Sequence, residues 1–316
     1  MKRPWLSVSL LAVVGVVGAV AAADVRVGPQ GPGFYRLRMG GDEVTALLDG
    51  THPFPADELL THVERKEVDA RLKADYLASP VQGSINAFLV RTPDRLVLID
   101  TGAGPLYAGD GGFLPTALLA AGYRPEDVTD ILLTHLHRDH VGGLIRNGTM
   151  LFPNAIVHVN QADADFWLNP ANEGKVQKVL LPMFPGAMDS LAPYQKAGHV
   201  VTFKGETEVL PGFHAIPAPG HTPGHTWYLV TSGDEHLLAW GDTVHVASVQ
   251  LADPGASIRY DYDEAAAAVS RKRALEEATA RGYWVAAAHV SFPGLGHIKR
   301  AGDGYQWIPV NYTRTP

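Results

Sequence analysis

A cluster of metal-ligating side chains follows directly on an apolar run near the middle of the chain. Residues 130–134 have the length and apolar content of a buried strand, and the next six positions hold His135, His137, Asp139 and His140. Because side chains at i and i+2 of an extended chain share a face, His135 and His137 can bind one cation. Asp139 and His140 lie beyond the expected turn and can serve a second. Burying so many polar groups is costly without a metal, so we expect a strand end that opens into a metal site.

The chain has 14 histidines and no cysteine. Thiolate ligands and thiol nucleophiles are therefore excluded, and any metal site must be built from nitrogen and oxygen donors. That donor set suits zinc best, with manganese, cobalt or iron as substitutes. We expect two divalent metal ions as the cofactor, with zinc as the first choice.

The first 23 residues have the features of a secretory signal peptide. Lys2 and Arg3 are basic, residues 6–20 are largely apolar, and Ala21-Ala22-Ala23 precedes Asp24. We expect cleavage before Asp24, which makes the mature protein exported, either periplasmic or secreted, with no membrane attachment after cleavage. An uncleaved anchor is the alternative, although the apolar stretch is short for a membrane span. Residues 24–316 are expected to form a single domain.

Charge restricts the range of partners. The formal net charge is −7, and it becomes −9 when the signal peptide takes Lys2 and Arg3 with it. An acidic protein is a poor partner for nucleic acid, so we expect a small-molecule substrate instead.

Strand and helix signals alternate along the chain and predict two β-rich halves with helices outside. The first half has a hairpin signal around Gly40-Gly41-Asp42, and residues 169–198, interrupted by proline and glycine, are expected to be a long ordered loop that acts as a lid or pocket wall. This pattern predicts an α/β fold, a four-layer αββα sandwich. We expect helices at residues 113–121, 161–168 and 263–280, and strands at 33–49, 85–90, 96–100, 130–134, 155–160, 200–203, 213–217, 226–230, 236–240 and, as a closing pair, 283–288 and 306–310.

Three more ligand-type residues come directly after expected strands. His221 follows the strand at 213–217, Asp242 follows 236–240, and His289 follows 283–288. Together with the first cluster they make five histidines and two aspartates, about the number that two cations with open positions need. His225 lies in the same Pro/Gly turn as His221 and is expected to hold that turn.

These ligands resemble, in order, those of the metallo-β-lactamase superfamily. The resemblance implies that His135, His137 and His221 hold one metal, that Asp139, His140 and His289 hold the other, and that Asp242 bridges the two. It also implies that Asp100, in Leu98-Ile99-Asp100-Thr101-Gly102, orients a ligand histidine. Asp139 and Asp242 are the expected catalytic residues, and hydroxide held between the two metals is the expected nucleophile.

Four further segments, 162–168, 184–188, 291–298 and 307–312, are similar to the methyl parathion hydrolase branch of that superfamily. The resemblance implies a substrate pocket walled by Trp167, Phe184 and Tyr107, and a homodimer. Four positions depart from the triesterase as we align them, and they are expected to line the pocket: Leu59, His245, Ile258 and Tyr260.

Such walls should suit a flat aryl ester or a lactone better than a bulky phosphotriester. The resulting hypothesis is a dinuclear zinc hydrolase that opens lactones and cleaves aryl esters. Two alternatives stay open at this point, an organophosphate triesterase and a metal-binding protein without turnover. A cysteine-dependent β-lactamase is excluded by composition, and a glyoxalase II acting on a cytosolic thioester conflicts with export.

Overall fold

Two seven-stranded sheets form the centre of the protein, seen in the computed structural model, which describes residues 30–315. The strand order in the first sheet is β1-β2-β4-β5-β6-β9-β10, with β5, β6, β9 and β10 parallel to one another. Its strands are β1 (Phe34–Met39), β2 (Asp42–Phe54), β4 (Val81–Arg91), β5 (Leu96–Ile99), β6 (Asp130–Leu132), β9 (Ile156–Asn160) and β10 (Val200–Phe203).

The second sheet is formed by the second half of the chain, in the order β11-β12-β13-β14-β16-β17-β18. Only β14 and β16 are parallel, and the remaining neighbours are antiparallel. Its strands are β11 (Thr207–Leu210), β12 (Phe213–Pro217), β13 (Thr226–Ser232), β14 (Glu235–Ala239), β16 (Trp284–Ala286), β17 (Leu295–Ala301) and β18 (Gly304–Pro309).

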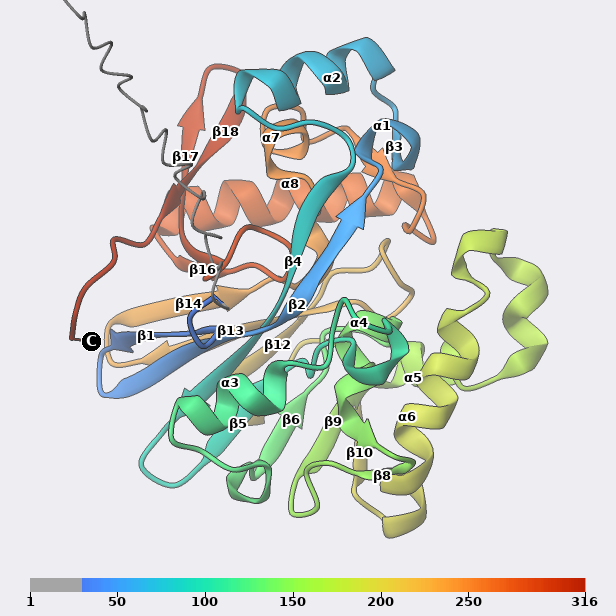
Figure 1. Cartoon of the computed structure of the whole chain (residues 1–316), viewed down its shortest axis with the longest axis vertical. Helices are drawn as coiled ribbons and strands as arrows, with labels where there is room; N and C mark the ends of the chain where they lie inside the picture. Colours follow the sequence, from blue (N-terminus) through green and yellow to red (C-terminus); the bar gives the residue numbers. More distant parts are fainter. Residues whose placement is uncertain (1–29, 316) are drawn as a thin grey trace, which may run out of the picture. The chain divides into compact units, whose positions relative to one another are not determined.

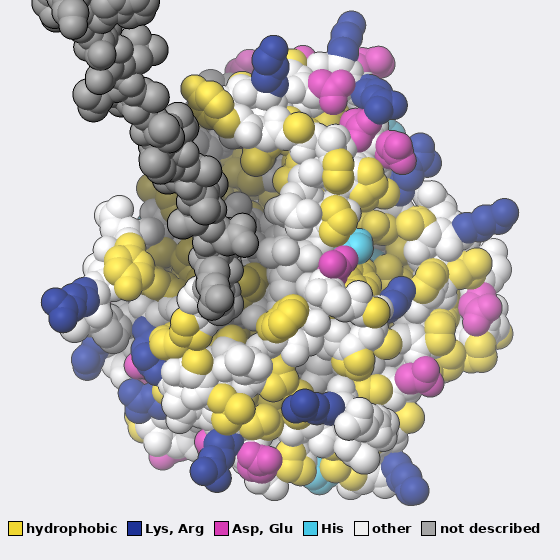
Figure 2. Space-filling view, viewed as in Figure 1, with side chains coloured by type: hydrophobic (Ala, Val, Ile, Leu, Met, Phe, Trp, Pro, Cys, Tyr) yellow, Lys and Arg dark blue, Asp and Glu magenta, His cyan; other side chains and the backbone are white. Residues whose placement is uncertain are grey.

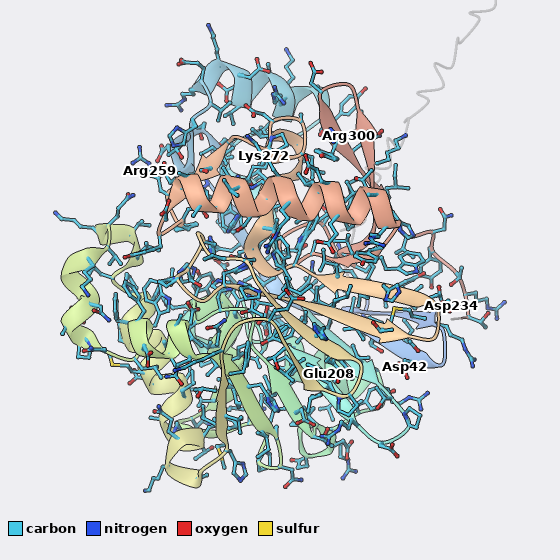
Figure 3. All side chains as sticks on the ribbon, turned by 180° about the vertical axis from the view of Figure 1, so that it is seen from behind. Asp42, Glu208, Asp234, Arg259, Lys272 and Arg300 are labelled. Atoms are coloured by element: carbon cyan, nitrogen blue, oxygen red, sulfur yellow. The ribbon has the colours of Figure 1, made fainter. Side chains whose placement is uncertain are left out.

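Helices cover the outer face of each sheet, which confirms the predicted four-layer αββα sandwich. Figure 1 shows α3 (Leu114–Ala120), α5 (Gln161–Trp167) and α6 (Met183–Ala197) on one side of the sheets and α8 (Glu264–Arg281) on the other. Seen from behind in Figure 3, α8 crosses the face of the second sheet, and Lys272 extends from it. Asp263 caps this helix by accepting a hydrogen bond from the Ala266 backbone N–H.

Alternation along the strands explains why both faces of the first sheet are apolar. In β4, Ala87 and Leu89 pack against the outer helices, whereas Phe88 and Val90 pack between the sheets. Successive side chains of a strand point to opposite faces, and a sheet covered on both sides needs apolar residues at every position.

Short elements complete the chain between the strands and long helices. They are the helices α1 (Ala56–Leu59), α2 (Arg65–Ala74), α4 (Arg138–Val141) and α7 (Ala247–Gln250), and the two-residue strands β3 (Leu60–Thr61), β7 (Ile145–Arg146), β8 (Thr149–Met150) and β15 (Ser257–Ile258).

The expectation of a long loop at residues 169–198 is wrong. Two 3₁₀ turns, Pro170–Lys175 and Lys178–Leu180, lead into the 15-residue helix α6. Phe184, Ala187, Leu191 and Tyr194 are buried at helical spacing against the first sheet. Pro193 is tolerated because the carbonyl it leaves without a donor belongs to Asp189, whose side chain lies on the exposed face.

The elements that were not predicted include α2, β11 and β17, as well as α6 and the short elements α1, α4, α7, β3, β7, β8 and β15. The expected closing pair of strands, 283–288 and 306–310, is separated by β17, which pairs with both. The predicted signal peptide lies outside the described residues. Among the residues that are described, no helix combines the length and the apolar composition needed to cross a bilayer.

Candidate metal centre

The predicted ligands gather into two groups at the ends of strands from both sheets. One group contains His135, His137, His221 and Asp242, and the other contains Asp139, His140, His289 and Asp242. In each group, one ligand atom per residue lies within 4.8 Å of every other, and all of these side chains are buried. The structure therefore brings all seven residues together in the two sets that the resemblance implied.

Asp242 faces both groups with its carboxylate, and His289 Nε2 lies near both oxygens, 3.1 Å from Oδ1 and 3.2 Å from Oδ2. Oδ2 lies 3.2 Å from His221 Nε2 and 3.6 Å from His135 Nε2. Oδ1 lies 3.0 Å from His140 Nε2 and 3.1 Å from His289 Nε2. This arrangement is the one required of a carboxylate that bridges two cations.

Unpaired buried atoms indicate that the residues present fit a pair of metal ions. His135 Nε2, His140 Nε2 and Asp242 Oδ1 are buried without a hydrogen-bond partner among the described residues. The 3.0 Å approach of His140 Nε2 to Asp242 Oδ1 does not count as a hydrogen bond. Each such atom costs about 1 to 3 kcal/mol when nothing binds it. Imidazole and carboxylate donors at these positions suit zinc or a similar divalent ion, which would satisfy all three atoms.

Electrostatics in the cluster favour the protonation states that metal ligands need at His135 and Asp242, but the opposite state at His221. Burial lowers the pKa of His135 well below its ordinary value, and the charge of His140 acts in the same direction. Burial alone would raise the pKa of Asp242, but the charges of His140 and His289 hold it well below its ordinary value. Burial lowers the pKa of His221, yet hydrogen bonds with Asp242 and Asp261 outweigh it and raise that pKa to about 9. Metal binding at His221 would therefore release a proton.

Asp100 organises the end of β6 and the first ligand segment. Its carboxylate accepts hydrogen bonds from the backbone N–H and the hydroxyl of Thr134, both at 2.8 Å. Its Oδ2 also lies 2.8 Å from His140 Nδ1. The opposite nitrogen of His140 consequently points at Asp242, so one aspartate fixes the direction of this ligand.

A second aspartate orients His221 and is itself held by a buried arginine. Asp261 Oδ1 lies 2.8 Å from His221 Nδ1, and its Oδ2 lies 3.5 Å from Arg271 Nη2. Arg271 is 1% exposed and donates to the backbone carbonyls of Thr243 and Ala256. The chain His221–Asp261–Arg271 thus links one ligand to helix α8.

Asp163 connects the two loops that carry the histidines. It accepts hydrogen bonds from the backbone N–H of Leu136, at 3.1 Å, and of Gly224, at 2.6 Å. The Thr222 hydroxyl donates to it at 2.9 Å. The last ligand, His289, is fixed by its Nδ1, which lies 2.9 Å from the Ser84 carbonyl oxygen.

His225 uses both of its ring nitrogens on the backbone. Its Nδ1 lies 3.2 Å from the Ala218 carbonyl, and its Nε2 accepts the Asp242 N–H at 3.1 Å. Burial, together with the charge of His221, lowers the pKa of His225 to about 3, so the ring is neutral. With neither nitrogen free, this histidine holds the position of Asp242 instead of joining a ligand group.

Only some of the residues predicted to form the substrate pocket line a cavity, and the others are buried. A cavity of about 390 Å3 is lined by Tyr107 and Tyr260 and also by Arg138 and Met183. Trp167 of α5 and Phe184 of α6 are fully buried in the core beside the first sheet. The Trp167 ring lies 5.1 Å from that of His137. Leu59 and Ile258 are buried in an apolar cluster near Tyr260, and His245 lies beside Asp242, 3.0 Å from its Oδ2.

Sequence reasoning missed the orienting residues Asp163, Asp261 and Arg271. Asp163 lies in the segment 162–168 that carries the branch resemblance, so the resemblance offered a signal for it. Asp261 and Arg271 have no spacing that sets them apart, because their role arises only when α8 packs beneath His221.

A two-sheet sandwich with a paired His/Asp cluster at its strand ends defines a class of metal-dependent hydrolase. Residues 80–289 match the family model described as the metallo-beta-lactamase superfamily, and the chain belongs to that superfamily.

Individual relatives share this fold and differ in how much of the chain they match. The hydrolase AbOPH, described as a member of the beta lactamase superfamily, is 38% identical, covers 90% of this chain and all of its own, and superposes with a TM-score of 0.86. AidC, described as a dizinc quorum-quenching lactonase and solved with the product N-hexanoyl-L-homoserine, is 29% identical, with a TM-score of 0.83 and coverage of 89% of this chain and 99% of its own. An N-acyl homoserine lactonase from Bacillus cereus is 28% identical over 48% of this chain, which spans 60% of that relative's length.

Removing the shared carboxylate should empty the site, whereas removing His225 should not. We expect Asp242→Ala to lose bound metal and His225→Ala to retain it, while the latter loses about 2 to 3 kcal/mol of stability because two buried backbone groups lose their partner. Metal content by elemental analysis and thermal unfolding measure the two effects. Equal metal loss in His225→Ala would contradict the assignment.

Asp261→Asn should weaken metal binding without removing a ligand. Because the amide cannot accept from both His221 and its other donors as the carboxylate does, we expect about a 10- to 100-fold loss of metal affinity in competition with a chelator. Asp189→Asn, on the exposed face of α6, is the matched control. A drop in melting temperature with unchanged metal affinity would show that Asp261 is only structural.

Proposed function

We propose that the chain is a dizinc hydrolase that opens lactones and cleaves aryl esters. The observation that carries this proposal is the pair of ligand groups sharing Asp242. Further support comes from AidC, described as a dizinc lactonase, which aligns with 89% of the chain. Bound metal ions would polarise a substrate carbonyl and lower the pKa of water toward neutrality.

The cavity beside the ligand cluster has a size that suits a small ester or lactone. Its volume of about 390 Å3 lies at the lower end of the range of roughly 300 to 1,000 Å3 that small-molecule sites occupy. Tyr260 supplies a flat aromatic wall, against which an aryl or lactone ring can pack, whereas the Tyr107 ring lies under the Arg138 guanidinium.

Two tyrosine hydroxyls in this cavity remain protonated. Burial raises the pKa of Tyr107 well above its ordinary value, and the nearby Asp139 carboxylate raises it further. Burial and Asp139 raise the pKa of Tyr260 as well. Both groups can therefore donate hydrogen bonds to a substrate oxygen at neutral pH.

His245 holds the shared carboxylate and is a neutral base. Burial is the main reason that its pKa is lowered, although Asp242 opposes the effect. Because a carboxylate only accepts, the His245 proton belongs on Nε2, which lies 3.0 Å from Asp242 Oδ2. The ring also stacks on His289 at 5.1 Å with a 19° interplanar angle. His245 therefore fixes Asp242 from the side next to Tyr260.

A substrate panel tests the proposal. We expect zinc-loaded protein to show its highest kcat/KM on dihydrocoumarin, an acyl-homoserine lactone or phenyl acetate, with turnover abolished by a chelator and restored by zinc. A higher value on methyl parathion would make the chain a triesterase, which the resemblance to that branch keeps as the second candidate. If the protein binds two metals but hydrolyses none of these four substrates, the result would favour a metal-binding protein without turnover.

His245→Leu should change selectivity between esters and phosphotriesters. Leucine cannot donate to Asp242 and places an apolar side chain beside Tyr260. We expect the ratio of phosphotriester to ester kcat/KM to rise severalfold, because the apolar side chain favours the apolar groups of a triester, whereas loss of the hydrogen bond to Asp242 affects both substrates alike. His214→Leu, an exposed site on β12, is the matched control. An unchanged ratio would mean that His245 does not influence the substrate.

A further inference from the structure

Polar and charged side chains line the cavity, outside the ligand cluster. Arg138, His52 and Asp110 all contribute to its lining, together with Tyr107. Arg138 stands between the ligands His137 and Asp139 in the chain, so its side chain starts at the metal site itself.

The Arg138 side chain is held in one position by three contacts. Its guanidinium lies over the Tyr107 ring, 5.1 Å from the centroid, and one Nη2 proton is donated to the Leu106 carbonyl. Its stem passes close to Gly186 of α6, where an added Cβ would come within 2.6 Å of the Arg138 Cγ. An arginine fixed in this way loses little side-chain entropy when it binds a further acceptor.

The loop that supports Arg138 is itself anchored. The carboxylate of Asp49 is buried and accepts four backbone hydrogen bonds, at 2.9 to 3.1 Å, from Ala103, Gly104, Gly112 and Leu114. These donors bracket residues 105–111, which include Tyr107. The aromatic surface beneath the guanidinium is thus set before any substrate arrives.

Arg138 has no carboxylate partner in the part of the chain that the structure describes. No Asp or Glu oxygen in residues 30–315 lies within 4.0 Å of its guanidinium nitrogens. Asp110 lines the same cavity, but its Oδ2 is bonded to His52 Nδ1 at 2.8 Å. Within residues 30–315, the Leu106 carbonyl is the acceptor found for Arg138, so most of its five guanidinium donors have no partner in this part of the chain.

The positive charge of Arg138 is not part of a larger basic surface on the visible face. In Figure 2, basic and acidic side chains are interspersed over the visible face, so an anion would meet no broad basic surface there. The whole chain is acidic, with a net charge of −7. Among the side chains that line the cavity, Arg138 is the one lysine or arginine, so any protein charge that favours an anionic substituent there would come from it.

We propose that Arg138 is a specificity-determining residue that binds a carboxylate carried by the substrate, so that the enzyme prefers anionic aryl esters or lactones. This inference rests on the proposed function and narrows its substrate class. The guanidinium matches a carboxylate with two parallel hydrogen bonds, and a charge-assisted hydrogen bond is worth about 1.5 to 3 kcal/mol, more than one to a neutral carbonyl. Because the guanidinium covers the Tyr107 ring, an aryl ring would pack beside Tyr260 and present its substituent to Arg138.

Two esters that differ in one charge test the proposal. They are 4-acetoxybenzoate and its methyl ester, which share the acetyl group, with each rate normalised to hydrolysis by hydroxide alone. We expect zinc-loaded protein to prefer the carboxylate by about tenfold or more in kcat/KM. Arg138→Met should bring the ratio close to one. Arg138→Lys should keep part of the preference, because the charge remains and the planar fork is lost.

Arg38→Met is the matched control, since Arg38 is exposed on β1, and its ratio should equal that of the wild type. Competitive inhibition by 4-hydroxybenzoate gives a readout independent of turnover, and Arg138→Met should weaken it about tenfold. Metal content and melting temperature are measured on every variant, and Arg138→Lys serves as the test if Arg138→Met does not fold.

The possible failures of the two proposals differ. Zinc-dependent turnover of the methyl ester, with no preference for the carboxylate or with a preference that survives in Arg138→Met, would overturn the role of Arg138 and leave the hydrolase intact. Absence of turnover of both esters and of the lactones would overturn the proposed function, and the inference with it.

Discussion

The carboxylate of Asp242 is shared between two sets of buried histidines. This sharing requires that the strand ends carrying those histidines meet around one residue. Five imidazoles lie within 3.0 to 3.6 Å of its oxygens, those of His135, His140, His221, His245 and His289. They arrive on loops from both halves of the chain. Gly241 allows this approach, because at φ 52° an added Cβ would lie 2.7 Å from His225 Nε2. A cluster this buried needs cations to satisfy it.

Much of the fold was predictable, because the apolar periodicity of each strand is a local property. Both sheets and the covering helices α3, α5 and α8 lie close to the expected ranges. Helix α6 was not predictable from its own residues, since Pro185, Gly186 and Pro193 argue against a helix. It forms because the sheet offers a surface for Phe184 and Leu191, a tertiary contact that overrides local propensity. Strand β17 has the sequence LGHIKRA, with only Leu295 and Ile298 as large apolar residues, and therefore shows no apolar period. Strand β11 was missed as well.

The ligand residues were predictable for a related reason. Residues 135–140 are neighbours in the chain, and His221, Asp242 and His289 each follow a strand, so position relative to a strand end was enough to find them. Asp261 and Arg271 act through packing between distant segments, which no local pattern encodes. The predicted pocket aromatics show that residue type alone does not separate a pocket wall from the core. Trp167 and Phe184 were expected at the pocket wall, but size and apolarity also suit the core, where both are fully buried.

The anchoring of the loop at residues 103–114 has a consequence for how such an enzyme can change. Asp49 holds only backbone groups at the two ends of this segment. The side chains between those ends, Tyr107 and Asp110 among them, can therefore be exchanged by mutation while the path of the main chain is retained, at the expense of their contacts with Arg138 and His52. Substitutions in this segment can therefore change the preference for ligands while the Asp49 anchor and the metal-binding residues beside it stay the same.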